Sequence, residues 1–209
     1  MSLIIADLSH YNDVQNISQA LEKVNGVIHK ASQGENEDPA FQVRMGLISG
    51  FDTLRGAYHF FDPNTDPRAQ ADTFFKVVKP FLPMFLGLDL EAGNAELTGG
   101  GWAKQGTDAN MKNVLAFLSQ LELLVTGLPG IYSYAYFMKT YLPGLDLSAW
   151  PLWLTAPATS NPKMPDFWKD WTIWQYDCEG IIQGILGDVD LSIFKGEKAD
   201  FQALYCKSR

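Results

Sequence analysis

The sequence predicts an α/β fold: a barrel of eight strands, with helices between the early strands and few helices later. Up to Tyr134, near-continuous apolar segments alternate with segments of helical periodicity, a pattern typical of a parallel sheet covered on its faces. From Pro151 onward the apolar segments continue, but their connections are rich in Pro, Gly and Asn. Eight strands without a linker or an internal repeat favour closure into one barrel. We therefore expect a single domain over residues 1–209.

The first half of the chain is expected to contain five strands and four helices in alternation. Each expected strand is a short apolar run, and the five runs are Leu3–Asp7, Gly26–Ser32, Arg55–Phe61, Pro83–Glu91 and Gly130–Tyr134. Each expected helix has apolar residues at helical spacing, and the four are Val14–Val24, one beginning near Asp38, Pro67–Phe81 and Asp108–Leu124. Gly127 ends the last of these helices.

The second half of the chain continues the strands but loses the helices. Three further strands are expected at Pro151–Ala156, Trp171–Tyr176 and Asp188–Phe194. A short helix over Lys198–Cys206 follows the last of them. These elements complete the barrel and leave its second half largely bare.

Composition and charge exclude several classes of partner. Hydrophobic residues make up 46% of the chain and charged residues 19%, which is a globular composition. The net charge of −8, with no run of Lys or Arg, argues against a nucleic-acid partner. No apolar stretch has the roughly 18–20 residues that a bilayer crossing needs, so we expect no membrane partner. We expect a monomer.

The two cysteines and the N-terminus bear on the cellular compartment. Cys178 and Cys206 are too few for a disulfide scaffold; they form either one bridge or, at least as readily, two buried thiols. The N-terminal sequence MSLIIADLSHYND lacks the basic region and long apolar run of a signal peptide. The protein is therefore expected to be made in the cytoplasm, unless a leader is missing from this sequence.

Carboxylates at the expected strand ends are the strongest functional signal. In a closed parallel barrel, functional residues collect at the carboxyl ends of the strands. Asp89 and Glu91 are two residues apart, so in a strand they point to the same face, where their mutual repulsion opposes folding. Glycoside hydrolysis needs such a pair, because one carboxyl must stay protonated while a second negative group stabilises an oxocarbenium-like centre. Asp7 and Asp190 are expected at the same mouth.

Several aromatic residues are candidates for binding a sugar at this mouth. They lie in or at the end of expected strands and are Tyr58, Tyr134, Trp153 and Trp174. Alternation along GIYSY lets either Tyr132 or Tyr134 face the mouth. The competing interpretation is that some of these rings belong to the core, as strand aromatics usually do.

Other potential motifs give no support for a metal or a cofactor. His10, His29 and His59 lack metal-ligand spacing, and His29 in an apolar strand is expected to be a hydrogen-bonded core residue. The TGGG run at Thr98–Gly101 lacks the Lys-Ser/Thr of a phosphate-binding loop; we interpret it as a loop beside the fourth strand. We expect no cofactor and no bound metal.

The motifs taken together resemble the glycoside hydrolase family 25 muramidases, the Chalaropsis-type lysozymes. The matching motifs, which follow the family's order, are IADLSHYNDVQ, VIHKASQG with DPAF, RGAYHFF, GLDLE, PLWLTA and WQYDCEGIIQGILGDVDLSIF. The resemblance covers about Ile4 to Phe194, and it implies a TIM-like modified barrel of five β/α units followed by three β-strands. It also implies a peptidoglycan glycan strand as substrate and partner, cleaved between N-acetylmuramic acid and N-acetylglucosamine without metal or cofactor.

The resemblance also implies residue roles. Glu91 matches the family's general acid/base, and Asp89 matches the carboxylate that orients the substrate's acetamido group or stabilises the positive centre directly. Asp7 and Asp190 match flanking acids, and the expected outcome is net retention. The DCEG segment departs from the family pattern, because Asp177 and Glu179 add negative charge where small polar residues are more common.

Two alternatives and the biological setting stay open. A non-catalytic glycan-binding module on the same barrel would have no need for a destabilising carboxylate pair. A metal-dependent hydrolase would need oxygen ligands in a defined geometry. The expected place of action is the cell wall, reached either after release of a phage lysin or by export of a bacterial wall enzyme.

Overall fold

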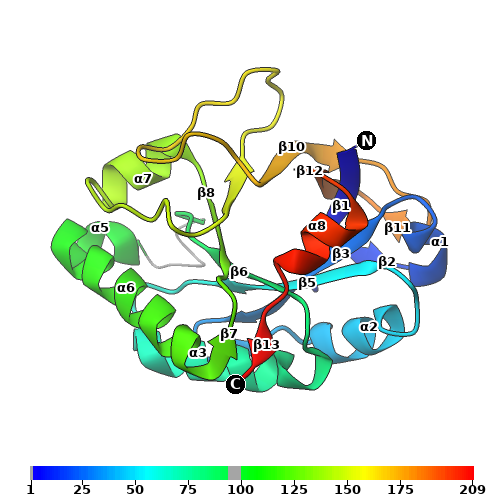
Figure 1. Cartoon of the computed structure of the whole chain (residues 1–209), viewed down its shortest axis with the longest axis horizontal. Coiled ribbons are helices and arrows are strands. Elements are labelled where there is room, and N and C mark those ends of the chain that lie inside the picture. The colour runs from blue at the N-terminus through cyan, green and yellow to red at the C-terminus, as the bar shows by residue number, and fades with distance from the viewer. Residues whose placement is uncertain (1, 94–99) are drawn as a thin grey trace.

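The computed structural model describes residues 2–93 and 100–209 and contains a closed eight-stranded barrel (Figure 1). The barrel strands are β1 (Ser2–Leu8), β3 (Gly26–Gln33), β5 (Leu54–Phe60), β6 (Phe85–Asp89), β8 (Gly130–Ser133), β9 (Leu152–Thr155), β10 (Ile173–Gly180) and β12 (Val189–Lys195). They follow the order β1-β12-β10-β9-β8-β6-β5-β3, and a further β1–β3 pairing closes the ring. All eight correspond to apolar runs in the sequence, so the barrel prediction is confirmed.

The direction of the last barrel strand differs from the expectation of a parallel sheet. Neighbouring strands from β1 through β3 to β10 pair in parallel. Strand β12 instead runs antiparallel to both β10 and β1. Its N-terminal end therefore lies beside the carboxyl ends of the other strands. Asp190, near the start of β12, reaches the same mouth as Asp7 for this reason.

The helices follow the early strands. They are α1 (Ile17–Leu21), α2 (Phe41–Ile48), α3 (Pro67–Val78), the 3-10 turn η1 (Lys79–Phe81), α5 (Gly101–Gln105), α6 (Thr107–Leu124), α7 (Ala135–Tyr141) and α8 (Lys198–Ala203). In Figure 1, α3 and α6 line one side of the barrel and α7 lies beside β8, whereas β10 and β12 have no helix outside them in the described part of the chain. Five β/α units followed by three strands describe this arrangement.

Local chemistry explains where some helices begin. The Asp66 carboxylate accepts hydrogen bonds from the Arg68 and Ala69 amides and Pro67 occupies the first turn, so α3 begins where the sequence predicts. Helix α1 is shorter than the amphipathic stretch around it, and Asn16 caps its start. Helix α2 begins at Phe41, after Asp38.

Pairs of two-residue strands tie down the ends of loops. Strand β2 (Asp13–Val14) pairs with β11 (Ile185–Leu186), and β7 (Val125–Thr126) pairs with β13 (Lys207–Ser208). Strand β4 (Asn36–Glu37) folds back on the end of β3. These pairs are too short to give an alternating pattern, and the sequence did not predict them.

A stack of large side chains fills the barrel interior. Phe201 of α8 contacts Phe85 with ring centroids 5.7 Å apart, and Phe85 contacts Trp153 at 6.3 Å. Trp153 in turn lies 4.9 Å from Tyr132. Gly130 leaves room for this stack, because a Cβ there would come within 2.4 Å of the Phe85 ring. Helix α8 thus closes one end of the barrel and leaves the other end open for a site.

The cysteines do not pair. Both thiols are free; Cys206 is buried, whereas Cys178 is exposed on β10. The expectation of one bridge or two buried thiols is therefore wrong for Cys178. Of the TGGG run, Thr98 and Gly99 lie outside the described residues, and Gly101 begins α5. Among the helices described, none combines the length and apolar character that a bilayer crossing requires.

Candidate active site

A cavity of about 180 Å³ opens at the mouth of the barrel and gathers all four carboxylates singled out in the sequence. Its lining residues come from the ends of β1, β3, β5, β6, β8 and β12 and from the loop after β1: Asp7, Ser9, Tyr11, Lys30, Tyr58, Phe60, Asp89, Glu91, Tyr132 and Asp190. Three cavities are larger and do not contain this cluster: two, of about 480 and 470 Å³, lie among residues near the opposite strand ends, and one of about 280 Å³ adjoins the mouth. The chemistry of the mouth, rather than cavity size, identifies the site.

Asp7 and Asp190 lie side by side at the mouth, where β1 pairs with β12. They are register partners between β1 and β12. Tyr58 lowers the pKa of Asp7 against the effect of burial, and Gln175 does the same for the pKa of Asp190. Gln175 also accepts a hydrogen bond of 2.6 Å from the Tyr132 hydroxyl. Side chains from β5, β8 and β10 therefore surround these two acids.

Asp89 is the most deeply placed carboxylate of the group. It ends β6 between Phe60 of β5 and Tyr132 of β8, and 4% of it is exposed. Its Oδ1 atom is buried and has no hydrogen-bond partner among the described residues. An acceptor of this kind is costly to leave unpaired. Because Asp89 lines the cavity, a donor on a bound ligand can complete its hydrogen bonding.

Glu91 lies beyond the end of β6 rather than in the strand, where the sequence placed it. The segment is nevertheless held in position, because the Leu90 amide donates to the Tyr132 carbonyl at 2.9 Å. The Ser133 hydroxyl donates to the Leu90 carbonyl at 2.8 Å. Leu90 is fully buried, which anchors the turn. Asp89 and Glu91 thus still line the same cavity, and Glu91 is the more exposed of the two.

Lys30 is a cavity residue that sequence reasoning missed. It lies in β3 and is 4% exposed, and its ammonium donates a 2.6 Å hydrogen bond to the Gln33 side chain. The ammonium also lies 4.8 Å from the centre of the Phe60 ring. A lysine inside an otherwise apolar strand was the available signal, because a buried charge usually has a partner or a function. Here its hydrogen-bond partner is Gln33, and the charges of nearby carboxylates, Asp89 foremost, oppose the lowering of its pKa by burial.

Burial raises the pKa of every acid in the cluster, and repulsion from a neighbouring acid adds to it, at Asp190 from Asp177 outside the cluster. Burial, Asp190 and Glu91 raise the pKa of Asp7 well above its usual range, and burial, Glu91 and Asp7 do the same to Asp89. Burial and then Asp190 raise the pKa of Glu91. Lys30 opposes these shifts at all three groups. The cluster therefore retains protons at a pH where isolated carboxyls have lost them.

Tyr58 and Tyr132 are the strand tyrosines that line the cavity, together with Phe60. Of the two tyrosines that alternation allowed, Tyr132 faces inward and is 8% exposed. Trp153 does not line the cavity; it lies below it, 1% exposed, with its indole N–H donating to the Ser192 hydroxyl at 3.0 Å. Its ring supports Tyr58 from beneath, with centroids 6.0 Å apart.

Tyr134 and Trp174 lie on the outer side of the barrel wall. Trp174 follows the inward-facing Ile173 by one position, and Tyr134 lies just beyond the end of β8, two positions after Tyr132. Both rings pack against the outer core layer. The Trp174 indole donates to the Ala156 carbonyl at 3.0 Å, and neither ring lines the cavity. Glu91 contributes to raising the pKa of Tyr134, second to burial. Tyr134 therefore borders the Glu91 segment without facing the cavity.

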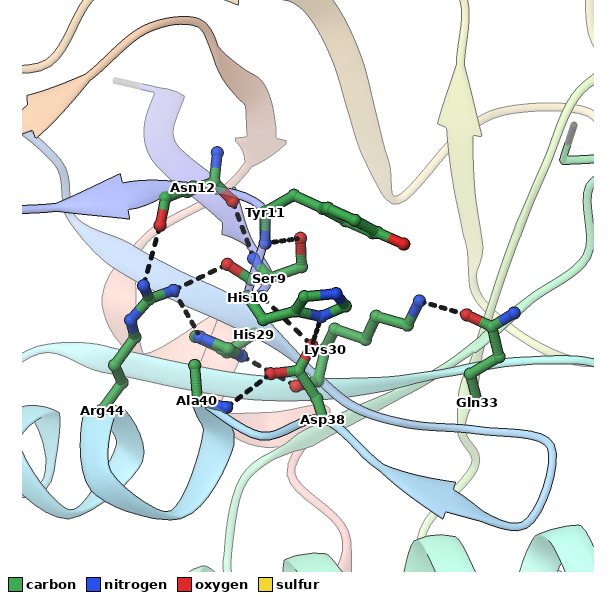
Figure 2. A network of polar contacts seen from close by, with 10 residues as sticks. All are labelled: Ser9, His10, Tyr11, Asn12, His29, Lys30, Gln33, Asp38, Ala40 and Arg44. Carbon is green, nitrogen blue, oxygen red and sulfur yellow. Dashed lines mark hydrogen bonds and ion pairs between the residues drawn. The ribbon is translucent and has the colours of Figure 1, made fainter. Parts of the chain in front are cut away.

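The loop after β1 is held by a polar network (Figure 2). Arg44 of α2 donates to the Ser9 carbonyl at 2.6 Å and to the Asn12 carbonyl at 2.8 Å. His29 accepts from Arg44 at 3.4 Å and donates from Nδ1 to the Lys30 carbonyl at 2.8 Å. Burial lowers the His29 pKa to about 4, so this ring is neutral. The network fixes the loop that carries Tyr11 over the cavity.

Comparison with known proteins identifies the family. The sequence profile described as glycosyl hydrolases family 25 matches residues 6–185. The chain belongs to this family. The crystal structure of a bacterial lysozyme from Streptomyces coelicolor superposes on this chain with a TM-score of 0.84 and 27% sequence identity. The superposition covers 97% of this chain and 96% of the lysozyme.

Curated relatives agree with the family 25 assignment. Lysozyme M1 of Streptomyces globisporus is 28% identical over an alignment of 209 positions, which covers 95% of this chain and 69% of the relative. YegX of Escherichia coli O157:H7, an uncharacterized protein, is 30% identical over 177 residues, or 83% of this chain. The match spans 60% of the length of YegX.

The histidines of this family 25 protein have structural partners. The expectation for His29 as a hydrogen-bonded core residue is confirmed, since it is fully buried and bonded to a backbone carbonyl. His59 contacts Ser32 at 2.8 Å and Gln70 at 3.0 Å, and burial lowers its pKa to about 3.

Within residues 2–93 and 100–209, no group of three or more His, Cys, Asp or Glu side chains has an arrangement that can hold a metal ion.

Replacing Lys30 with Met is expected to shift the acid limb of the kcat/KM profile to higher pH. The ammonium lowers the pKa of Asp7, Asp89 and Glu91, so without it a carboxylate needed as an anion stays protonated to higher pH. The measurement is kcat/KM against pH on soluble glycan strands. Lys23→Met, at an exposed position, is the matched control. An unchanged profile for Lys30→Met would show that the ammonium does not tune the cluster.

Proposed function

We propose that this family 25 protein is a peptidoglycan muramidase that cleaves the β-1,4 bond between N-acetylmuramic acid and N-acetylglucosamine. The observation that carries the proposal is the pairing of Glu91 and Asp89 on one wall of the mouth cavity. Glu91 is a carboxyl whose pKa is raised, and Asp89 has a buried oxygen in need of a donor. These are the two groups that retaining hydrolysis with substrate assistance requires.

Glu91 is the proposed general acid and base. Burial and Asp190 raise its pKa, so it can hold a proton near neutral pH and donate it to the leaving glycosidic oxygen. Its partial exposure in the cavity lets it reach the substrate and, later, a water molecule. As the carboxylate formed by the first step, it then accepts a proton from that water.

Asp89 is the proposed partner of the substrate's 2-acetamido group. The acetamido N–H would donate to Asp89 Oδ1, the atom that lacks a partner in the described structure. The acetamido oxygen then attacks the anomeric carbon on the face opposite the leaving group as the glycosidic bond breaks. Water later attacks the same carbon from the face that the leaving group left, and the bond to the acetamido oxygen breaks. Two inversions give net retention. Asp7 and Asp190 are the proposed flanking acids, which set the local charge and hydrogen bonding around Glu91 and Asp89.

Substrate binding is proposed to place the proton on the correct carboxyl. In the free protein Asp89 has its pKa raised further than Glu91, because it is more deeply buried and repelled by both Glu91 and Asp7. A hydrogen bond from the acetamido N–H stabilises the Asp89 anion and lowers its pKa. The shared proton then resides on Glu91, where the reaction needs it.

The cell wall is the proposed place of action. Peptidoglycan strands are the proposed partner, and the aromatic Tyr11, Tyr58 and Tyr132 rings give the cavity the apolar and hydrogen-bonding surfaces that sugars use. The chain's net charge of −8 does not favour general attraction to an anionic wall. Affinity is therefore expected to depend on the cavity itself.

Digestion of purified, de-O-acetylated peptidoglycan tests the proposal. The products are reduced with borohydride and analysed by mass spectrometry, and reduced muramic acid at the new ends is the expected result. Reduced glucosamine ends would overturn the bond assignment, and no new ends at any pH would overturn hydrolysis. The same digestion in excess EDTA is expected to proceed unchanged; loss of activity there would favour a metal-dependent hydrolase.

A further inference from the structure

A second cavity, of about 280 Å³, adjoins the catalytic cavity on the far side of Lys30. Lys30 is the residue that lines both spaces. The other lining residues come from the loop after β1, the β3–β4 hairpin and the segment after β5: His10, Gln33, Asn36, Glu37, Asp38, Pro39 and Asp62. Of these lining residues only Pro39 is apolar. The space therefore suits a polar or charged ligand rather than an apolar one.

The inner wall of this cavity is pre-formed by hydrogen bonds (Figure 2). Asp38 Oδ2 accepts from His10 Nδ1 at 2.7 Å and from the His10 amide at 3.1 Å, while Oδ1 accepts from the Ala40 amide at 2.9 Å. Asp38 is thus committed to holding the loop. Figure 2 shows Lys30 extending beside this pair toward Gln33. A ligand would meet a fixed surface and would not have to order it.

The inner wall of the cavity carries both signs of charge, with the Asp38 carboxylate already bonded to His10, whereas the charged groups nearer solvent are acids. Lys30 supplies a buried ammonium at the wall shared with the catalytic cavity. Glu37 is exposed on β4, and Asp62 is partly exposed opposite it. A ligand that carries an anionic group near the catalytic cavity and a cationic group farther out would match this arrangement.

We propose that this second cavity binds the peptide stem of the substrate, an inference that rests on the proposed muramidase function. Each muramic acid carries, on the ether at O3, a short peptide that contains carboxylates and commonly a free amine. A muramic acid bound beside Asp89 and Glu91 places this branch next to Lys30. A stem carboxylate then lies near the Lys30 ammonium, and the stem amine lies near Glu37. The amides of Gln33 and Asn36 line the space between them.

The test compares two substrates that differ only in the peptide. Soluble glycan strands are used either with their stems or after an N-acetylmuramoyl-L-alanine amidase has removed them. Glu37→Gln is expected to lower kcat/KM on peptide-bearing strands by roughly threefold, the scale of one exposed ion pair, and to leave kcat/KM on peptide-free strands unchanged. Glu35→Gln is the matched control, because Glu35 is exposed on the same hairpin and does not line the cavity.

A second variant fills the cavity instead of removing a charge. Asn36→Trp, at an exposed position of β4, is expected to give a larger loss that is again confined to peptide-bearing strands. Equal losses on both substrates, or no loss on either, would overturn the stem-binding role. If the unmodified protein cleaves neither peptide-bearing nor peptide-free strands, that result would instead overturn the proposed muramidase function.

Discussion

Replacing Glu91 with Gln is expected to lower kcat/KM on peptidoglycan by about 10³-fold, within the range that general acid catalysis contributes. Glutamine keeps the size and hydrogen-bonding shape of the side chain but has no acidic proton to donate. The backbone contacts that hold Leu90 and the neighbouring turn do not involve the Glu91 side chain. The fold is therefore expected to persist, as judged by circular dichroism and thermal unfolding.

The measurement is the release of new reducing ends under conditions where the unmodified protein is active. Glu179→Gln is the control, because Glu179 is an exposed acid on β10 that does not line the cavity. That variant is expected to retain activity. Full activity of Glu91→Gln in a folded protein would contradict its role as the acid and would direct attention to Asp190 or Asp7.

Replacing Asp89 with Asn is expected to cost about 10²-fold or more in kcat/KM, as loss of one preorganised charge contact does, and to stabilise the protein near neutral pH. The sign follows from linkage. Burial, Glu91 and Asp7 raise the pKa of Asp89 in the folded state above its value of 3.8 in the unfolded chain. The stability associated with the protonated form is fully present below pH 3.8 and is lost as the pH rises through the folded-state pKa. Asparagine does not ionise and avoids that loss.

Thermal unfolding at several pH values measures this effect. The midpoint temperature of Asp89→Asn relative to the unmodified protein is expected to increase from about pH 4 to pH 7, with about 2–4 °C for each kcal/mol gained in a chain of this size. Asp146→Asn is the control, since Asp146 is fully exposed and its pKa is lowered by Ser148. A lower midpoint for Asp89→Asn at pH 7 would show that the carboxylate stabilises the fold.

The strands and the four acids were predictable because their signals are local. A barrel strand buried on both faces, such as β6, gives a continuous apolar run. A carboxylate at the end of such a run, as at Asp89, is unusual enough to indicate a site. Helix α3 was predictable at its start because Asp66 and Pro67 form a strong cap.

Features that depend on distant pairing were not predictable. The antiparallel direction of β12 follows from its partners β1 and β10, and its own apolar run is the same in either direction. Trp153 occupies an inward position, but whether it reaches the cavity depends on Phe85 and Tyr132, which fill the space around it. The role of Lys30 becomes visible only when acids from the ends of β1 and β6 come close to it.

The antiparallel pairing of β12 with β1 has a consequence for how the protein is made. Asp7 emerges from the ribosome among the first residues and Asp190 among the last, yet the two are register partners at the mouth. The ring of strands cannot close until β12 is available, so the carboxylates come together, and repel one another, only in the final stage of assembly. A nascent or truncated chain that ends before β12 therefore lacks Asp190 and the closed mouth on which the proposed hydrolysis depends. The proposed activity would therefore be detected only after the chain has been synthesised through β12 and the barrel has closed.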